Sequence, residues 1–155
     1  MKARINSQTP TFSKSIVGIL CLTIMLLSSS LIHSQTEYPD TPVGKRLKEV
    51  VELINKSDTT EIKQYAKENF GTDFLNALTI KQHVEMTQRI HSNFPDLVLH
   101  TIESSSDYEL NGVLLSTSTN NLLTVKIFTE EKEPYKISRM GFRPAGTYTP
   151  PANDK

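Results

Sequence analysis

Three histidines after position 34 are the side chains best suited to metal binding or proton transfer: His83, His91 and His100. His83 and His91 lie on one predicted helix, separated by two turns and about 80° of rotation. A helical zinc pair such as H-E-x-x-H is closer, at four positions. We therefore predict no metal site and expect His83 and His91 to be polar residues at the surface or at a pocket rim.

Residues 35–155 contain no recognisable motif for serine or phosphate chemistry. The nucleophile elbow G-x-S-x-G and the pair S-x-x-K are both missing from this segment. A glycine-rich phosphate loop is missing as well. The single cysteine, Cys21, excludes an internal disulfide framework and a zinc site built from cysteines. The sequence therefore predicts no catalytic residue and no cofactor.

A small-molecule pocket is the remaining chemical possibility. His100 lies on a predicted strand, three positions before Glu103, so the two side chains point to opposite faces if the strand is regular. If His100 points into the cavity of a curved sheet, it lines a pocket with Tyr65 or Tyr108. The alternative role for His100 is a hydrogen bond across the sheet.

Residues 1–34 have the parts of a secretory signal peptide. The segment has no acidic side chain and three basic ones: Lys2, Arg4 and Lys14. The apolar run 16–27 is shorter than the ~20 residues that a membrane span needs, and small serines follow it. We predict cleavage between Ser34 and Gln35 and export to the periplasm or the cell exterior. An uncleaved membrane anchor is the alternative.

The charge balance changes when residues 1–34 are removed. The whole chain has 17 basic and 17 acidic side chains, a net charge of zero. Without the leader, 14 basic side chains face 17 acidic ones, and the net charge is −3. This balance argues against a nucleic-acid partner, because phosphate binding needs an excess of Lys and Arg.

Apolar residues at helical spacing predict helices after a short leader, 35–40. The first helix begins with Thr41 as its cap and Pro42 in the first turn, and its apolar stripe covers Val43–Ile54. Charged side chains on the opposite face are expected in solvent: Lys45, Lys48, Glu49 and Glu52. Three further helical segments are predicted: 58–71, 73–78 and 80–93.

The period of the apolar residues changes to two after Pro95, which indicates β-strands. Four are predicted: Leu97–Glu103, Tyr108–Thr117, Leu122–Thr129 and Tyr135–Phe142. Their short connections favour an antiparallel meander, and Gly112 marks a possible bulge. We therefore expect an α+β domain over 41–143, with N-terminal helices packed on a curved four-stranded sheet. A Pro-rich tail or linker follows at 144–155. Five phenylalanines are expected in the core: Phe70, Phe74, Phe94, Phe128 and Phe142.

Two stretches carry a resemblance to a known family: TPVGKRLKEVVELIN at 41–55 and EPYKISRMGFRP at 133–144. They resemble a bacterial accessory domain that precedes secreted serine hydrolases of the beta-lactamase-like type or tail-specific-type peptidases. The resemblance covers residues 40–145 and implies a cystatin-like or nuclear-transport-factor-2-like fold, secretion and no catalytic residue. In the similar proteins a catalytic domain follows, whereas this sequence ends at Lys155, so we expect either a free-standing version or a shortened one.

The sequence supports three functional hypotheses. The first is a secreted, non-catalytic accessory or binding domain whose partner is a secreted hydrolase or another envelope protein. The second is a cone-shaped domain that binds or converts a small molecule in a pocket between sheet and helices. The third is a truncated serine hydrolase or peptidase without its catalytic domain. In each case we expect no stable membrane span after the signal is removed.

Overall fold

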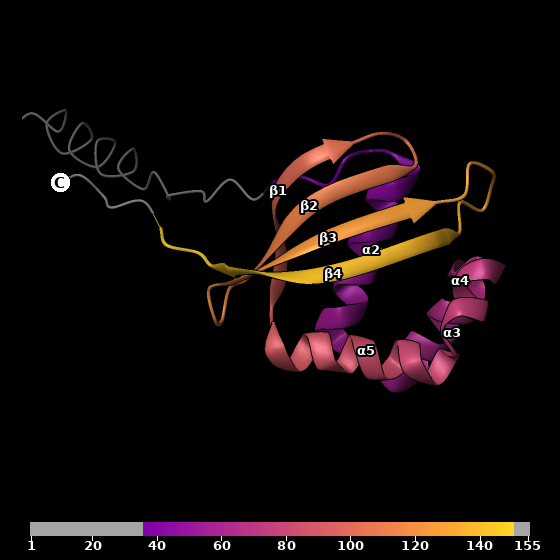
Figure 1. Ribbon diagram of the computed structural model, residues 1–155, viewed down its shortest axis with the longest axis horizontal. Helices are drawn as coiled ribbons and strands as arrows, with labels where there is room; N and C mark the ends of the chain where they lie inside the picture. Colours follow the sequence, from indigo (N-terminus) through magenta and orange to yellow (C-terminus); the bar gives the residue numbers. More distant parts are fainter. Residues whose placement is uncertain (1–35, 151–155) are drawn as a thin grey trace, which may run out of the picture. The chain divides into compact units, whose positions relative to one another are not determined.

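The computed structural model describes residues 36–150, which form helices followed by an antiparallel sheet (Figure 1). The helices are α2 (Pro42–Lys56), α3 (Thr59–Asn69), α4 (Thr72–Ala77) and α5 (Ile80–Asn93). The strands are β1 (Leu97–Ser105), β2 (Glu109–Ser116), β3 (Asn121–Thr129) and β4 (Ile137–Thr147). The expected α+β class is confirmed. The predicted signal peptide at 1–34 lies outside the described residues.

Helix α2 begins where its capping residues predict. The Thr41 hydroxyl accepts a hydrogen bond from the Gly44 N–H at 3.2 Å, and Pro42 occupies the first turn, where its missing N–H costs nothing. The helix ends at Ser57, which adopts a left-handed conformation with φ of 53°. One face of α2 is fully buried against the sheet and includes the expected apolar stripe: Val43, Leu47, Val50, Val51 and Ile54.

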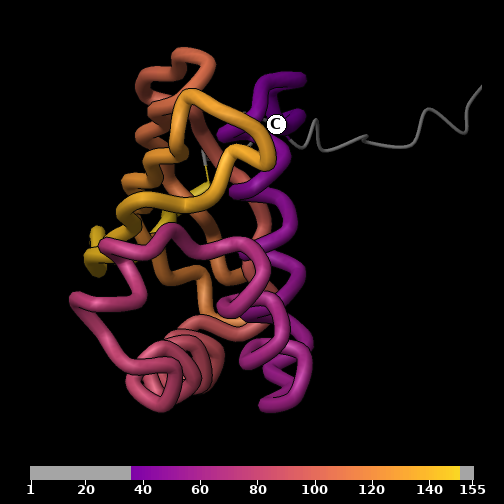
Figure 2. The backbone as a smooth tube through the Cα atoms, turned by 90° about the vertical axis from the view of Figure 1, so that its right-hand side faces the viewer, coloured from indigo at the N-terminus to yellow at the C-terminus, as the bar shows by residue number. Residues whose placement is uncertain are grey.

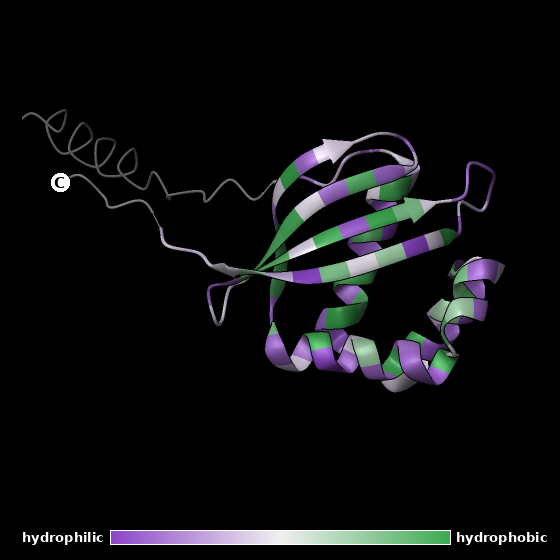
Figure 3. Cartoon of the chain, viewed as in Figure 1, coloured by the Kyte–Doolittle hydropathy of each residue, from purple (hydrophilic) through white to green (hydrophobic). Residues whose placement is uncertain are grey.

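The four strands pair in chain order, β1-β2-β3-β4, and every pairing is antiparallel. The sheet is one layer and α2 lies behind it in the second layer, as the side view shows (Figure 2). Buried residues alternate with more exposed ones along β2 and β3, so one face of the sheet is turned to the helices and its side chains are mostly apolar (Figure 3). The core joins α2 to the inward side chains of the sheet: Leu99, Leu110, Leu114, Leu123, Val125 and Ile127.

Two irregularities bend β1, and both lie opposite the β2 segment that contains Gly112. The β1–β2 register shifts between Leu99 and Thr101 and again between Ile102 and Ser104. A side chain at Gly112 would bring its Cβ to 2.9 Å from the Thr101 carbonyl oxygen. Gly112 therefore permits the close approach of the bent strand, and the irregularity lies in β1 rather than in β2.

The structure extends the domain at both ends beyond the predicted 41–143. Strand β4 continues to Thr147, into the segment predicted as a Pro-rich tail. In the predicted leader, the Thr36 hydroxyl donates to the His100 carbonyl at 2.6 Å, and Tyr38 packs against the core. The sequence did not indicate these contacts because neither segment has a repeating apolar pattern.

Candidate functional site

The three predicted pocket residues lie at separate places. Tyr65 lines a hollow between α2 and α3, whereas Tyr108 lines a hollow at one end of the sheet. The His100 ring contacts Tyr148 edge-on, with 4.9 Å between ring centroids. The Tyr108 ring stacks on Tyr135, whose backbone belongs to the polar network that contains Tyr65. Tyr65 and Tyr108 are thus connected through contacts of Tyr135, and the three residues do not line one shared pocket.

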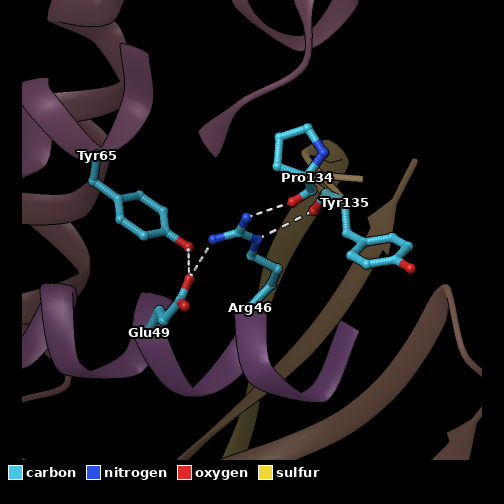
Figure 4. Close-up of polar contacts among 5 residues, drawn as sticks. All are labelled: Arg46, Glu49, Tyr65, Pro134 and Tyr135. Carbon is cyan, nitrogen blue, oxygen red and sulfur yellow. Dashed lines mark hydrogen bonds and ion pairs between the residues drawn. The ribbon is translucent and has the colours of Figure 1, made fainter. Parts of the chain in front are cut away.

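A polar network joins α2, α3 and the β3–β4 connection (Figure 4). Arg46 donates from Nη2 to the Pro134 carbonyl at 2.6 Å and from Nε to the Tyr135 carbonyl at 3.1 Å. Its Nη1 donates to Glu49 Oε2 at 2.7 Å, and the same oxygen accepts from the Tyr65 hydroxyl at 2.8 Å. The Arg46 side chain is only 15% exposed, so these bonds replace contacts with water.

The electrostatics of this network favour a structural role. Burial and then the hydrogen bond to Glu49 raise the pKa of Tyr65 well above its usual value, so the phenol stays protonated. Burial disfavours the charge of Arg46, but the bond to Glu49 and its charge outweigh burial and raise the pKa of Arg46. The guanidinium already donates hydrogen bonds to Pro134, Tyr135 and Glu49, so these donors are not available to a substrate. Glu49, which was expected on a solvated face, is therefore a partner within the fold.

A hollow of about 370 Å³ borders this network between α2 and α3. Its lining has both acidic and basic side chains, and it includes Glu52, Lys56, Glu61 and the neutral Asn69. Lys56 and Glu61 already pair at 3.2 Å across its mouth. The interior between the sheet and α2, where the second hypothesis places a pocket, is occupied by core side chains.

His83 corrects one prediction from sequence. It is 1% exposed and its ring packs edge-on against Phe70 and Phe74, at 4.8 and 4.7 Å between centroids. Neither ring nitrogen has a partner at good hydrogen-bond geometry, and burial lowers the pKa of His83 more than the nearby backbone groups of Phe74 and Leu78 raise it. His83 is thus a neutral core residue and not the surface or pocket-rim residue predicted. His91, two turns on, is half-buried.

Within residues 36–150, no three His, Cys, Asp or Glu side chains are grouped closely enough to hold a metal ion. In the same part of the chain, every helix is too short or too polar to cross a membrane.

The second face of the sheet, away from the helices, is an open surface. Its side chains are those that point outward from the central strands, and they include four half-buried ones: Val113, Leu115, Leu122 and Phe128. Phe128 was expected in the core, but the period of two turns it outward because Ile127 and Thr129 are buried. The Arg139 guanidinium lies over the Phe128 ring, 3.9 Å from its centroid.

Basic side chains gather on this open face along β3 and β4. Arg139 and Arg143 on β4 form no ion pair among the described residues, whereas Lys126 on β3 pairs with Glu109 at 2.8 Å. The hydrogen bond from Lys126 lowers the pKa of Glu109. Gly141 lies between the two arginines, and a Cβ built on it meets nothing within 4 Å. A hollow of about 380 Å³ opens over Gly141, bounded by Arg143 and Lys126 and, at its far side, by Glu103 on β1.

The outer edge of β4 has one backbone hydrogen bond to another element among residues 36–150: the Ile137 carbonyl accepts from the Gly71 N–H at 2.8 Å. Helix α4, which follows Gly71, packs against β4, and no such hydrogen bond among these residues reaches the edge beyond Ile137. Pro144 has no N–H and fits a paired strand only with its nitrogen turned away from the neighbour. By alternation, Met140 and Phe142 direct their N–H and C=O groups to the same open edge. The edge therefore offers unpaired donors and acceptors next to a basic surface.

Sequence reasoning missed most of these residues. Arg46, Arg139 and Arg143 lie in the stretches 41–55 and 133–144 that carry the resemblance, but they formed no catalytic or binding motif, because their roles depend on strand and loop positions that no short pattern encodes. One signal was available: Arg46 is next to Leu47 of the apolar stripe, which indicates that its side chain lies at the border of the core.

Comparisons of the chain with models of protein families, with curated proteins and with solved structures each found no match. The fold and the surface of residues 36–150 are therefore the basis on which function is inferred. They define an α+β domain that has one sheet face covered by helices and the other face open.

Proposed function

We propose that this protein is an exported, non-catalytic accessory domain that binds a partner protein through the open side of its sheet. The observation that carries the proposal is the free edge of β4 beside a face with half-buried apolar and exposed basic side chains. Unpaired strand edges are ready templates for another chain, and natural proteins usually cover or shorten them. An edge without backbone hydrogen bonds to another element of the described chain over residues 140–143 is therefore consistent with a binding function.

The internal polar network supports binding over catalysis. Its carboxylate, Glu49, is held by Arg46 and Tyr65, and Tyr65 stays protonated. A general base must be within reach of a proton on a substrate and have a pKa near the working pH. The raised pKa of the Tyr65 phenol does not meet the second requirement, and the Glu49 oxygen that Tyr65 contacts is already bonded to Arg46. The network is therefore better explained as the connection that holds the β3–β4 loop to α2.

The fold is proposed to be of the cystatin-like or nuclear-transport-factor-2-like kind. A long N-terminal helix packed on the inner face of an antiparallel meander supports this assignment. The resemblance of 41–55 and 133–144 to the accessory domain of secreted hydrolases supplies the proposed partner class, a secreted serine hydrolase or peptidase. The basic start and apolar run of 1–34 support export.

The proposal is tested by photo-crosslinking in the producing cells. A photoreactive phenylalanine analogue is placed at Gly141, where a side chain meets open space, and in a matched protein at Lys63, which is exposed on α3. We expect a discrete adduct with an exported protein from position 141 and none from position 63. No adduct at either position, or an adduct from position 63 alone, contradicts a partner-binding role for the open side of the sheet.

A further inference from the structure

The free edge of β4 also constrains the chemistry of what it binds. We propose that β4 accepts an extended segment of alternating acidic and apolar residues from a partner protein, as a fifth strand of the sheet. This inference rests on the proposed function and specifies the partner's binding segment. Main-chain hydrogen bonds to Met140 and Phe142 would hold such a segment, and its side chains would provide the specificity.

The side chains of β4 determine the pattern of the partner strand. Arg139, Gly141 and Arg143 lie on the open face, whereas Met140 and Phe142 lie toward the core, where both are half-buried. A residue directly opposite in a neighbouring strand is within about 5 Å on the same face, so opposite charges stabilise the pairing and like charges weaken it. A partner strand fits both faces of β4 if its acidic side chains lie opposite the arginines and its apolar side chains cover Met140 and Phe142.

Gly141 provides space at the centre of this surface. The hollow over it is bounded by Arg143, by Lys126, which already pairs with Glu109, and at its far side by Glu103. A carboxylate on the added strand would therefore meet Arg143 as the cation without an ion pair among the described residues. Glycine weakens a strand interior and often marks a place where another chain approaches closely. The position of Gly141, between two unpaired arginines, agrees with that use.

A second copy of this chain is a poorer occupant than an acidic segment. Antiparallel pairing of two β4 edges about Gly141 would place Arg139 of one copy opposite Arg143 of the other, which is a like-charge pair. The chain's own residues 1–34 have basic side chains and no acidic one, so their charge also disfavours the site. The opposite edge of the sheet is already contacted, since Thr36 bonds to His100 on β1.

The test uses two short blocked peptides, one of alternating glutamate and valine and one in which lysine replaces glutamate. Binding to the purified protein is measured by calorimetry and by backbone chemical shifts. We expect the glutamate peptide to bind roughly tenfold more tightly than the lysine peptide, with shifts along β4. In the double variant Arg139→Glu and Arg143→Glu the preference should reverse.

A Met140→Pro variant removes one edge donor and should abolish binding of both peptides, since an edge strand tolerates proline with its nitrogen outward. If that variant does not fold, the charge-reversal variant still decides the question. Equal affinity for the two peptides, shifts outside β4, or a dimer formed through β4 would overturn the inference. A crosslinked partner at Gly141 without peptide binding would support the proposed function and contradict strand addition at β4. Peptide binding without a crosslinked partner would support strand addition and contradict the proposed function.

Discussion

At the scale of single residues, Arg46 connects distant parts of the domain. It holds the carbonyls of Pro134 and Tyr135, which are almost ninety positions away in the chain, and pairs with Glu49 one helical turn ahead. A hydrogen bond to a charged group contributes about 1.5–3 kcal/mol to stability. Arg46 makes three such bonds, so we expect the network to contribute substantially to the free energy of unfolding.

Replacing Arg46 by alanine should lower the free energy of unfolding by ~2–3 kcal/mol, because two carbonyls lose their side-chain donor and the Glu49 carboxylate keeps only the Tyr65 hydroxyl. Urea denaturation of the purified protein measures the change. Lys45→Ala is the matched control, because its ion pair with Asp40 is exposed and should contribute well under 1 kcal/mol. Equal effects of the two substitutions would show that the network does not stabilise the fold.

His83 predicts a dependence of stability on pH. Burial lowers its pKa in the folded protein, so below the unfolded value of about 6.5 the unfolded chain binds a proton that the folded protein does not. Stability is therefore full above about pH 6.5 and falls as the pH decreases through that value. Unfolding measured between pH 7.5 and about 5 should show this loss, and His83→Phe should show less of it. An identical pH dependence in both proteins would contradict the buried, neutral histidine.

At the scale of elements, helix positions were predicted well and the sheet's details were not. Thr41 and Pro42 give a local signal that needs no tertiary information, and α2 begins there. The bends of β1 depend on its fit to β2, so the sequence indicated only Gly112 on the partner strand. The burial of His83 depends on the packing of α5 against Phe70 and Phe74, which no periodicity encodes.

Gly112 and Gly141 form a matched pair of positions for testing which places in the sheet have room for a side chain. Gly112→Ala should destabilise the domain by about 1–3 kcal/mol, because the new methyl meets the Thr101 carbonyl at 2.9 Å. Gly141→Ala should be neutral or slightly stabilising, because its methyl meets open space and alanine loses less entropy. Thermal unfolding of the two variants compares them directly. A larger loss at Gly141 would mean that the outer face of β4 is already covered.

At the scale of the whole molecule, residues 36–150 form one domain that supplies the core and the proposed binding surface. Residues 1–34 have the composition of an export signal. The order of helical and strand patterns predicted the α+β class, but neither these patterns nor the resemblance indicated the free edge of β4. That edge appears only when strand order and neighbours are known.

Export makes a prediction about the mature protein. Cleavage after Ser34 would leave Gln35 as the first residue and a net charge of −3. N-terminal sequencing of the protein recovered from the periplasm or the medium should begin at Gln35. Recovery of the intact chain from the membrane fraction, with Lys2 still present, would instead support an uncleaved anchor.

Both proposals depend on a β4 edge that is open to a partner strand. Amide hydrogen exchange of the purified protein measures this directly. The Met140 and Phe142 amides should exchange at least about tenfold faster than those of Arg139 and Gly141, which face β3, and should become protected when the glutamate–valine peptide is added. Uniform protection along β4 in the protein alone, or no change with the peptide, would contradict the claim.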